Sequence, residues 1–164
     1  MESPFARLFL DLQEQIKNEV PEITYIEQDL GQLGSDDPRK MMSFPGVLID
    51  FPATGFSNLQ GLNQLAAPTI SITLVMDTYS QTYHLAPLEV RELGLNYLEL
   101  EQKLFMAVQS WESDYCESLV RTNTNGHNRN DVGLRVRELT FTTQFEDMSC
   151  DDDSQQYSLS LRTE

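Results

Sequence analysis

The chain has 164 residues, 40% of them hydrophobic, and its formal net charge is −15. This length suits one domain, and 8 Phe, 6 Tyr and 1 Trp exclude a disordered chain because they can fill a core. The 26 acidic residues against 11 basic ones argue against direct nucleic-acid binding and against docking on an anionic membrane. The alternative use of the acids is solubility alone.

The cysteines, Cys116 and Cys150, form no CxxC pair and no cluster with histidine. We therefore expect two reduced thiols, with no zinc site and no disulfide. The first residues lack the basic and apolar stretches of a signal peptide, and no apolar run approaches the roughly 20 residues that span a bilayer. These features predict a protein made and used inside a cell, or in a particle assembled there.

A helix is predicted at the start of the chain. Ser3 suits the N-cap, Pro4 is tolerated in the first turn, and Pro21 ends the segment. Apolar side chains recur between them at steps of three and four residues: Phe5, Leu8, Phe9, Leu12, Ile16 and Val20. Such a stripe is typical of a helix that packs on a core.

Strands are predicted next, with a short extended piece at 23–28, a polar loop at 34–40 and a strand at 46–51 closed by Pro52. Residues 52–68 show no periodicity and are predicted as a long loop, a kind of segment that often binds partners. The clearest strand spans 69–79. There, Ile70, Ile72, Leu74 and Met76 alternate with Ser71, Thr73, Val75 and Asp77, which predicts one face toward the core and one face outward.

The second half begins with a mixed stretch at 80–94. A helix is predicted from Asn96, a suitable N-cap, to Trp111. A strand at 117–122, a hairpin turn at 123–131 and a long returning strand at 132–145 follow. The apolar parity of this last strand changes near Arg137 and Glu138, which predicts a β-bulge or bend.

These elements predict an α+β fold, in which an antiparallel or mixed β-sheet carries both α-helices on one face. Residues 1–146 are expected to form the single domain. Residues 147–164 are acidic and rich in serine, which predicts a flexible tail. Within it, serine and leucine alternate in Ser158-Leu-Ser-Leu161, so the alternative prediction is that this segment adds a short strand.

No pattern predicts a catalytic, cofactor or metal site. His84 and His127 stand outside any HxxxH or HxH spacing and are expected to be exposed, and no phosphate loop or GxSxG elbow occurs. Asp151-Asp152-Asp153 lacks the glycine and distal glutamate of a calcium loop. We therefore expect no cofactor and no enzyme.

Two acidic patterns keep a weaker alternative open. Glu101-Gln-Lys103 is similar to a nuclease ExK motif, but it falls within the predicted helix, where an exposed face explains it better. Asp50 and Asp77 lie on adjacent predicted strands and could approach one another. An enzyme built from scattered carboxylates is the third and least favoured hypothesis.

The order of elements carries a resemblance. An amphipathic N-terminal helix leads into Gly46-Val-Leu-Ile-Asp50 and then into Thr69-Ile-Ser-Ile-Thr-Leu-Val75, a helix at 95–111 follows, and 132–145 ends in Leu-Thr-Phe-Thr-Thr-Gln-Phe. Over residues 5–146 the chain resembles the tail-terminator (tail-completion) proteins of long-tailed bacteriophages and related prophages. No diagnostic motif contributes to this resemblance.

The resemblance implies an α+β subunit that forms a ring, usually of six copies. Such a ring caps the tail tube, docks the head-side connector, assembles in the host cytoplasm and stays in the virion tail. The implied partners are other copies of the chain and the tail-tube and connector proteins. The family has no catalytic residues and no motif that marks ring contacts, and the acidic segment after Glu146 departs from its pattern.

Two questions stay open at this point. The stretch 52–68 holds more apolar residues than a solvated loop needs, and they predict either a subunit contact or a flap folded over the sheet: Phe56, Leu59, Leu62 and Leu65. The alternative function, from a different class, is a monomeric acidic adaptor or inhibitor that binds one partner protein.

Overall fold

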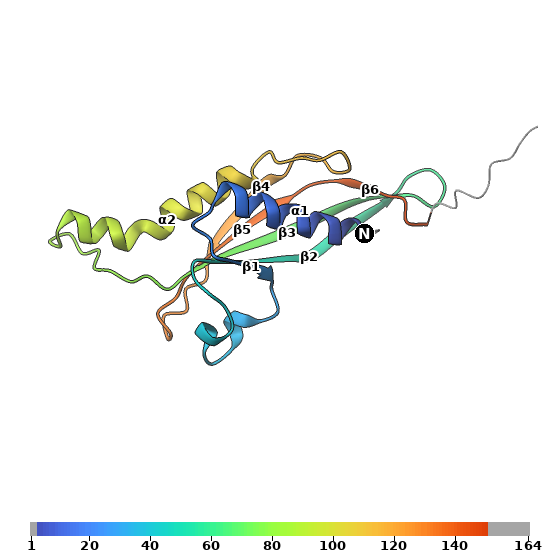
Figure 1. The fold of residues 1–164 in the computed structure, drawn as a ribbon. Helices are drawn as coiled ribbons and strands as arrows, with labels where there is room; N and C mark the ends of the chain where they lie inside the picture. The colour runs from blue at the N-terminus through green and yellow to red at the C-terminus, as the bar shows by residue number, and fades with distance from the viewer. Residues whose placement is uncertain (1–2, 151–164) are drawn as a thin grey trace, which may run out of the picture.

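The structure, a computed structural model, describes residues 3–150, and this part contains two α-helices and six β-strands (Figure 1). The helices are α1 (Pro4–Glu19) and α2 (Leu88–Val108). The strands are β1 (Tyr25–Gln28), β2 (Gly46–Asn58), β3 (Gln64–Met76), β4 (Val120–Gly126), β5 (Arg135–Thr142) and β6 (Phe145–Asp147). Two 3-10 turns, η1 (Gln32–Gly34) and η2 (Pro38–Lys40), lie within the loop between β1 and β2.

The strands form one mixed sheet in the order β1-β2-β3-β5-β4. Only β1 and β2 run parallel, and the other pairs are antiparallel. β5 pairs with β3 from Thr69 to Met76, and β6 pairs with β3 from Gln64 to Ala66. β6 therefore lies in line with β5 along the same edge of β3. The α+β class and the mixed sheet are therefore confirmed.

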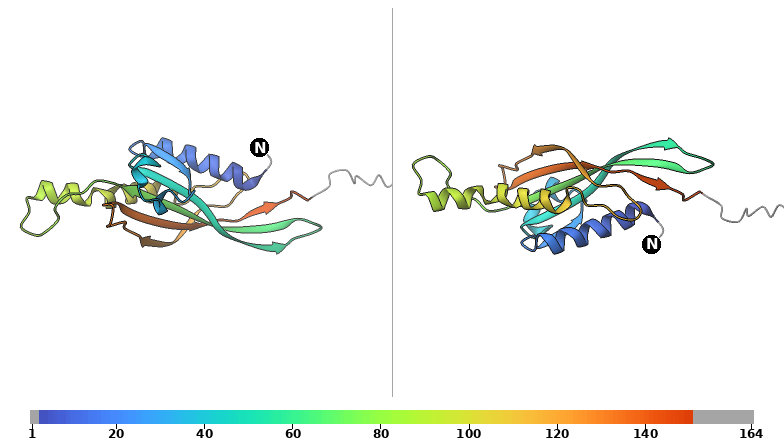
Figure 2. Two further views of the ribbon diagram at one scale, coloured as in Figure 1. Left: turned by 90° about the horizontal axis from the view of Figure 1, so that it is seen from below. Right: turned by 90° about the horizontal axis from the view of Figure 1, so that it is seen from above.

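Both helices pack on the same face of the sheet, as predicted (Figures 1 and 2). Ser3 is the N-cap of α1, and its side-chain oxygen accepts a hydrogen bond from the Ala6 amide at 3.4 Å, which satisfies one of the unpaired amides of the first turn. The buried residues of this face come from α1, α2 and the central strands, and include Leu8, Leu12, Ile16, Leu100, Leu104, Ile49, Ile70, Ile72, Leu74, Leu139 and Phe141.

The opposite face of the sheet is also covered, which corrects the prediction that residues 69–79 point one face outward. Val75 is fully buried there, and Ser71 and Thr73 are each only 8% exposed. The Ser71 hydroxyl donates to Glu138 at 2.7 Å. Val75 belongs to a second apolar cluster, contributed by the loop between β1 and β2, by β2 and by the β5 region: Leu33, Met42, Phe44, Leu48, Val132, Leu134 and Val136. The central strands are therefore buried on both faces.

This second cluster explains the change of parity in residues 132–145. Val136 faces the loop cluster, whereas Leu139 and Phe141 face the helices. The register between β3 and β5 runs unbroken over the full length of β5, so the predicted bulge in this strand is wrong. The irregularity lies in β4 instead, between Arg121 and Asn123. The β4–β5 hairpin itself is confirmed, with β4 displaced toward the turn from the predicted 117–122.

The predicted loop at 52–68 is wrong, because β2 and β3 continue through it as a hairpin. A register shift between Asp50 and Ala53 carries the chain past Pro52, which has no amide to donate. Pro52 is tolerated because β1 ends opposite Ile49 and β2 is an edge strand beyond that point. Residues 59–63 form the turn, and Leu59 N–H donates to Asn63 O at 2.9 Å.

α2 starts eight residues earlier than the predicted Asn96, at Leu88, with Pro87 at the N-cap. Its buried residues all lie in the second half, from Leu100 onward. The first half has no buried side chain and therefore shows no core-facing stripe. For this reason the apolar pattern of the sequence predicts only the later part of the helix. The helix ends at Val108, and Trp111 packs against the core from the following turn.

The molecule is elongated, and two segments project from its body at opposite ends (Figures 1 and 2). One is the outer part of the β2–β3 hairpin, and the other is the first half of α2 with the chain that precedes it. β6 ends at Asp147, one residue beyond the predicted domain limit. The rest of the predicted tail from 151 onward, including Asp151-Asp152-Asp153 and Ser158–Leu161, lies outside the described residues.

Candidate protein-interaction surface

The hairpin arm, residues 51–68, holds the four residues predicted as a subunit contact. Phe56 is 50% exposed, Leu59 41% and Leu62 70%, and Leu65 is half-buried. Gly61, at φ +71°, shapes the turn between the two strands. The arm extends away from the body, so these residues do not fold back over the sheet (Figure 2).

The register divides the four residues between the two faces of the arm. Phe56 lies opposite Ala66, which in turn lies opposite Phe145, so all three share the face that carries the helices. Leu65 lies opposite Ser57 and Glu146 and therefore points to the other face. Leu59 and Leu62 are in the turn. The structure thus brings Phe56, Leu59 and Leu62 to the outer end of the arm and separates Leu65 from Phe56.

The arm is also free of charge. Between Asp50 and Asp77 the sequence has no Asp, Glu, Lys, Arg or His, although the whole chain carries a net charge of −15. The inner part of this stretch is the buried strand β3, where an uncharged sequence is expected. The outer part is exposed, where charged side chains normally protect a strand edge from other chains. This uncharged run was the sequence signal that could have identified the arm.

The α2 arm, residues 77–99, is the second projection and carries several exposed apolar side chains. Seven of its large apolar side chains are exposed by 39–75%: Tyr79, Tyr83, Leu85, Leu88, Leu93, Leu95 and Leu98. The chain of residues 77–87 packs along the helix at Gly94. A Cβ at Gly94 would stand 2.9 Å from Ser80 O and 2.5 Å from a Thr82 methyl carbon. Glycine therefore allows the two segments of the arm to lie in contact.

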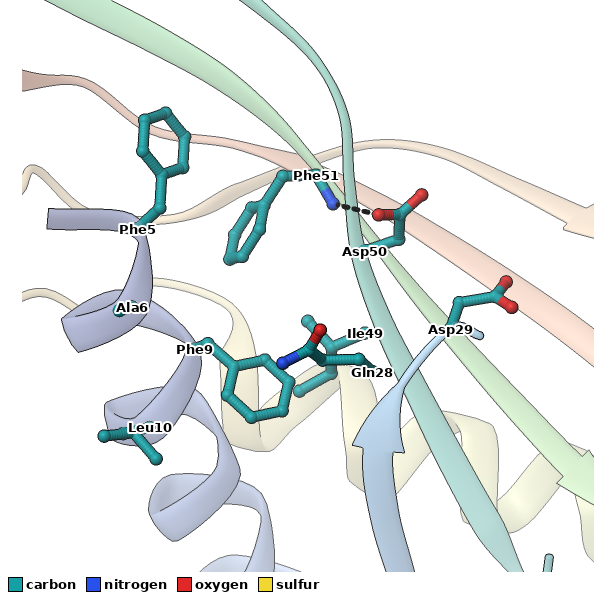
Figure 3. Close-up of a pocket in the computed structure, with 9 residues that line it drawn as sticks. All are labelled: Phe5, Ala6, Phe9, Leu10, Gln28, Asp29, Ile49, Asp50 and Phe51. Carbon is teal, nitrogen blue, oxygen red and sulfur yellow. Dashed lines mark hydrogen bonds between the residues drawn. The ribbon is translucent and has the colours of Figure 1, made fainter. Parts of the chain in front are cut away.

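A groove lies at the base of the hairpin arm, between the first half of α1 and strands β1 and β2 (Figure 3). Its volume is about 360 Å³. Phe5 and Phe9 of α1 face Phe51 of β2 across it, and the Phe5 and Phe51 rings meet edge to face at 5.6 Å. Asp29 and Asp50 line the strand side, with exposed carboxylates. Sequence reasoning missed this groove, because its walls come from three separate segments.

Polar contacts fix α1 to the loop that follows α2. Arg7 pairs with Asp114 at 2.8 Å and lies 4.0 Å from the Tyr115 ring centre, and the Tyr115 hydroxyl donates to Asp11 at 2.8 Å. Burial and the Asp11 carboxylate together raise the pKa of Tyr115. Burial also raises the pKa of the Cys116 thiol, which keeps it in the unreactive protonated form.

The remaining residues considered for chemistry are dispersed. Glu101 binds Arg137 of β5 and Lys103 binds Glu22, so the ExK pattern is divided between two ion pairs. Asp50 lies opposite Ser71, which places it six residues along the strand from Asp77, or about 20 Å.

The two histidines are exposed, as expected, and His127 Nε2 lies 3.0 Å from a Glu138 carboxylate oxygen. Within residues 3–150, no three His, Cys, Asp or Glu side chains gather as a metal site would require. Neither α-helix of the described part is both long and apolar enough to cross a bilayer.

Comparison with known proteins gives a likeness of fold. No family model matches the chain, and no curated protein matches its sequence. Among solved structures, the chain is similar to one in the structure described as "Virion of native gene transfer agent (GTA) particle", with a TM-score of 0.51 and 11% identity. The match covers 85% of this chain and 95% of the other, so nearly the whole of that subunit has a counterpart here. At this identity the likeness establishes a common fold.

Proposed function

We propose that the chain is a structural subunit of a phage-like particle, and specifically a tail terminator. In this role it forms a ring, of six copies as in the family it resembles, that caps the tail tube and joins it to the head-side connector. The observation that carries the proposal is the fold shared, over 85% of this chain and 95% of the other, with a subunit of a gene transfer agent virion. The order of the elements in the sequence supports the same role.

The shape of the molecule suits a ring. Copies in a ring meet head to tail, so each needs two different surfaces on opposite sides. The hairpin arm and the α2 arm supply apolar surfaces at opposite ends of the molecule (Figure 2). We assign Phe56, Leu59 and Leu62 at the end of the hairpin arm to one subunit contact, with Leu65 contributing from the other face.

The missing charge on the hairpin arm supports this assignment. Two copies that each carry −15 repel one another wherever acidic surfaces meet. The β2 side and the tip of the arm can approach a second copy without that penalty, whereas Glu146 and Asp147 of β6 lie beside the β3 side. In this proposal the chain is not an enzyme. Its partners are further copies, the tail-tube protein and the connector, and it assembles in the host cytoplasm before entering the virion tail.

Light scattering coupled to size exclusion tests the ring. Salt screens repulsion between exposed charges, with a screening length of about 10 Å at 0.1 M. We therefore expect a larger mass at high than at low salt, at equal protein concentration, and closed rings in electron micrographs of the high-salt sample. A monomeric mass in both buffers at the highest concentration reached would contradict the proposal.

The monomeric acidic adaptor or inhibitor is the second candidate, and the net charge of −15 is the observation that favours it. An acidic surface can occupy a basic groove of a partner protein. This candidate predicts the opposite salt dependence, because screening weakens attraction between opposite charges. A chain that stays monomeric and binds a basic partner most tightly at low salt would favour the adaptor over the ring subunit.

A further inference from the structure

β2 has a free outer edge along the hairpin arm. β1 pairs with β2 only from Gly46 to Ile49, and the last contact is the bond from Asp29 N–H to Ile49 O at 3.0 Å. From Asp50 to Asn58, no strand within residues 3–150 pairs with this edge. The Phe51 amide donates to Asp50 Oδ1 at 2.8 Å and Pro52 has no amide. The other outward amides and carbonyls of this edge are available to an added strand that lies in line with β1, beyond the end of β1 at Gln28.

The aromatic groove lies directly beside this free edge. Ile49 and Phe51 of β2 line it and belong to the helix-facing side of the sheet, and Phe5, Phe9 and Leu10 of α1 form the facing wall (Figure 3). An added strand would point every second side chain to this side, because successive side chains alternate. The groove would then receive apolar side chains at alternate positions, the arrangement by which strand addition obtains specificity.

One segment of the chain itself has the matching pattern. Residues 154–161 are uncharged, Tyr157, Leu159 and Leu161 alternate with Ser158 and Ser160, and Arg162 follows. The three apolar side chains suit the groove side, and the serines suit the opposite side. Arg162 would then lie near the end of the added strand, where the exposed carboxylates of Asp29 and Asp50 line the groove.

The position at which the described chain ends favours docking on a second copy. β6 runs toward the tip of the hairpin, with Asp147 opposite Gln64, and it lies on the β3 side, whereas the groove lies on the β2 side. The 14 residues after Cys150 reach roughly 45 Å when extended. To enter its own groove, the chain would have to cross from the β3 side to the β2 side of the arm and reverse its direction. If a second copy is placed beyond the tip of the hairpin, the chain that leaves β6 already runs toward the groove of that copy.

We propose that the groove between α1 and the free edge of β2 binds residues 157–162 of a second copy as an added strand. Leu159 and Leu161 enter the groove, and Arg162 pairs with the acidic groups beside it. This inference rests on the proposed self-assembly of the chain and adds to it a second contact, separate from the end of the hairpin arm.

The first test uses a fluorescein-labelled peptide of residues 151–164 and the full-length Leu159→Asp/Leu161→Asp protein, whose own tail cannot occupy the groove. We expect saturable binding by fluorescence anisotropy. The same two substitutions in the peptide should weaken binding by roughly tenfold or more, because they remove the buried apolar side chains. A Ser158→Asp/Ser160→Asp peptide adds the same charge on the other side of the strand and should retain binding.

Variants of the protein locate the site. Leu10→Asp adds a charge to a groove residue that is 46% exposed, and it should also weaken binding by roughly tenfold or more. Met41→Asp, at a site 54% exposed and outside the groove, should have no effect. Equal thermal stability of the two variants shows that both fold. No saturable binding, or equal binding of the two altered peptides, would overturn the proposal.

The mass of the full-length proteins in solution, measured by light scattering, distinguishes failure of this inference from failure of the proposed ring. Docking between copies predicts that Leu159→Asp/Leu161→Asp lowers the wild-type mass, or raises roughly tenfold the concentration needed for assembly. Peptide binding with an unchanged mass would place the tail in its own groove and overturn docking on a second copy. Assembly of the wild type without peptide binding would overturn this inference and leave the ring standing. A monomeric wild type would remove the ring and, with it, docking between copies.

Discussion

The inner and outer halves of the β2–β3 pair are continuous in the sheet but differ in what surrounds them. In the inner half, Leu74 packs under the helices and Val75 under the loop cluster, so both faces are buried. In the outer half, only the base of the arm, at Phe51 and Ala66, packs on the helix-side core, and Phe56 and Leu62 are exposed in the described part of the chain. The same two strands thus first form the centre of the core and then leave it as an apolar, uncharged projection.

This difference separates residues needed for folding from residues available for contacts. Apolar side chains in the inner half stabilise the fold by leaving water. Phe56 and Leu62, beyond the base of the arm, remain largely in water in the single chain, so they contribute little to its stability. We infer that the outer half is kept apolar and uncharged for contact with another subunit.

The largest expected difference between the halves is in stability. Leu74→Ala, at 1% exposure, should lower the free energy of unfolding by about 2–5 kcal/mol, because it leaves a cavity between the sheet and the helices. Leu62→Ala is the matched change at 70% exposure and should cost about 0.5 kcal/mol or less. Urea denaturation of both variants measures these values. Equal costs would show that the arm packs on the body.

A smaller effect is expected at the glycines of the two arms. Gly94→Ala places a Cβ 2.9 Å from the Ser80 carbonyl oxygen, which belongs to the backbone and must shift, at a cost of about 1–3 kcal/mol. Gly55→Ala in the hairpin arm meets no atom within 4 Å and should change stability by about 0.5 kcal/mol or less. Hydrogen exchange should show faster opening of residues 77–99 in Gly94→Ala alone. Unchanged exchange there would mean that the two segments of the α2 arm are not packed together.

The two cysteines give a comparison that needs no substitution. Cys116 is 6% exposed and its raised pKa favours the thiol, whereas Cys150 is exposed. Since iodoacetamide reacts with the thiolate, the native protein at neutral pH should gain one adduct, at Cys150. Peptide mass spectrometry identifies the site. Early labelling of Cys116 would show that the contact between α1 and the loop after α2 opens readily.

The sequence predicted the elements that pack directly on the core. α1 was found from its cap at Ser3 and its regular apolar spacing, and the centre of β3 from the alternation around Leu74. Such patterns arise because burial on one side selects apolar residues at the period of the element. Where both faces are buried, as at Val136, the alternation was misread as a bulge.

The sequence failed where an element leaves the core. Within residues 3–150, the hairpin arm has no side that is buried along its length, and Pro52 indicated a stop, so residues 52–68 were predicted as a loop. The first half of α2 was missed for the same reason, since nothing buried marks its period before Leu100. The groove beside Phe51 depends on tertiary packing of α1, β1 and β2 and has no local pattern.

The central claim is that the end of the hairpin arm serves assembly and not folding. Its most direct test is sedimentation equilibrium of Phe56→Ser/Leu62→Ser at high salt, with Met41→Ser as a control of similar exposure on another surface. We predict that the double variant unfolds at the wild-type temperature within a few degrees but sediments as a monomer, while Met41→Ser assembles as the wild type does. A double variant that assembles with the wild-type mass would contradict the claim.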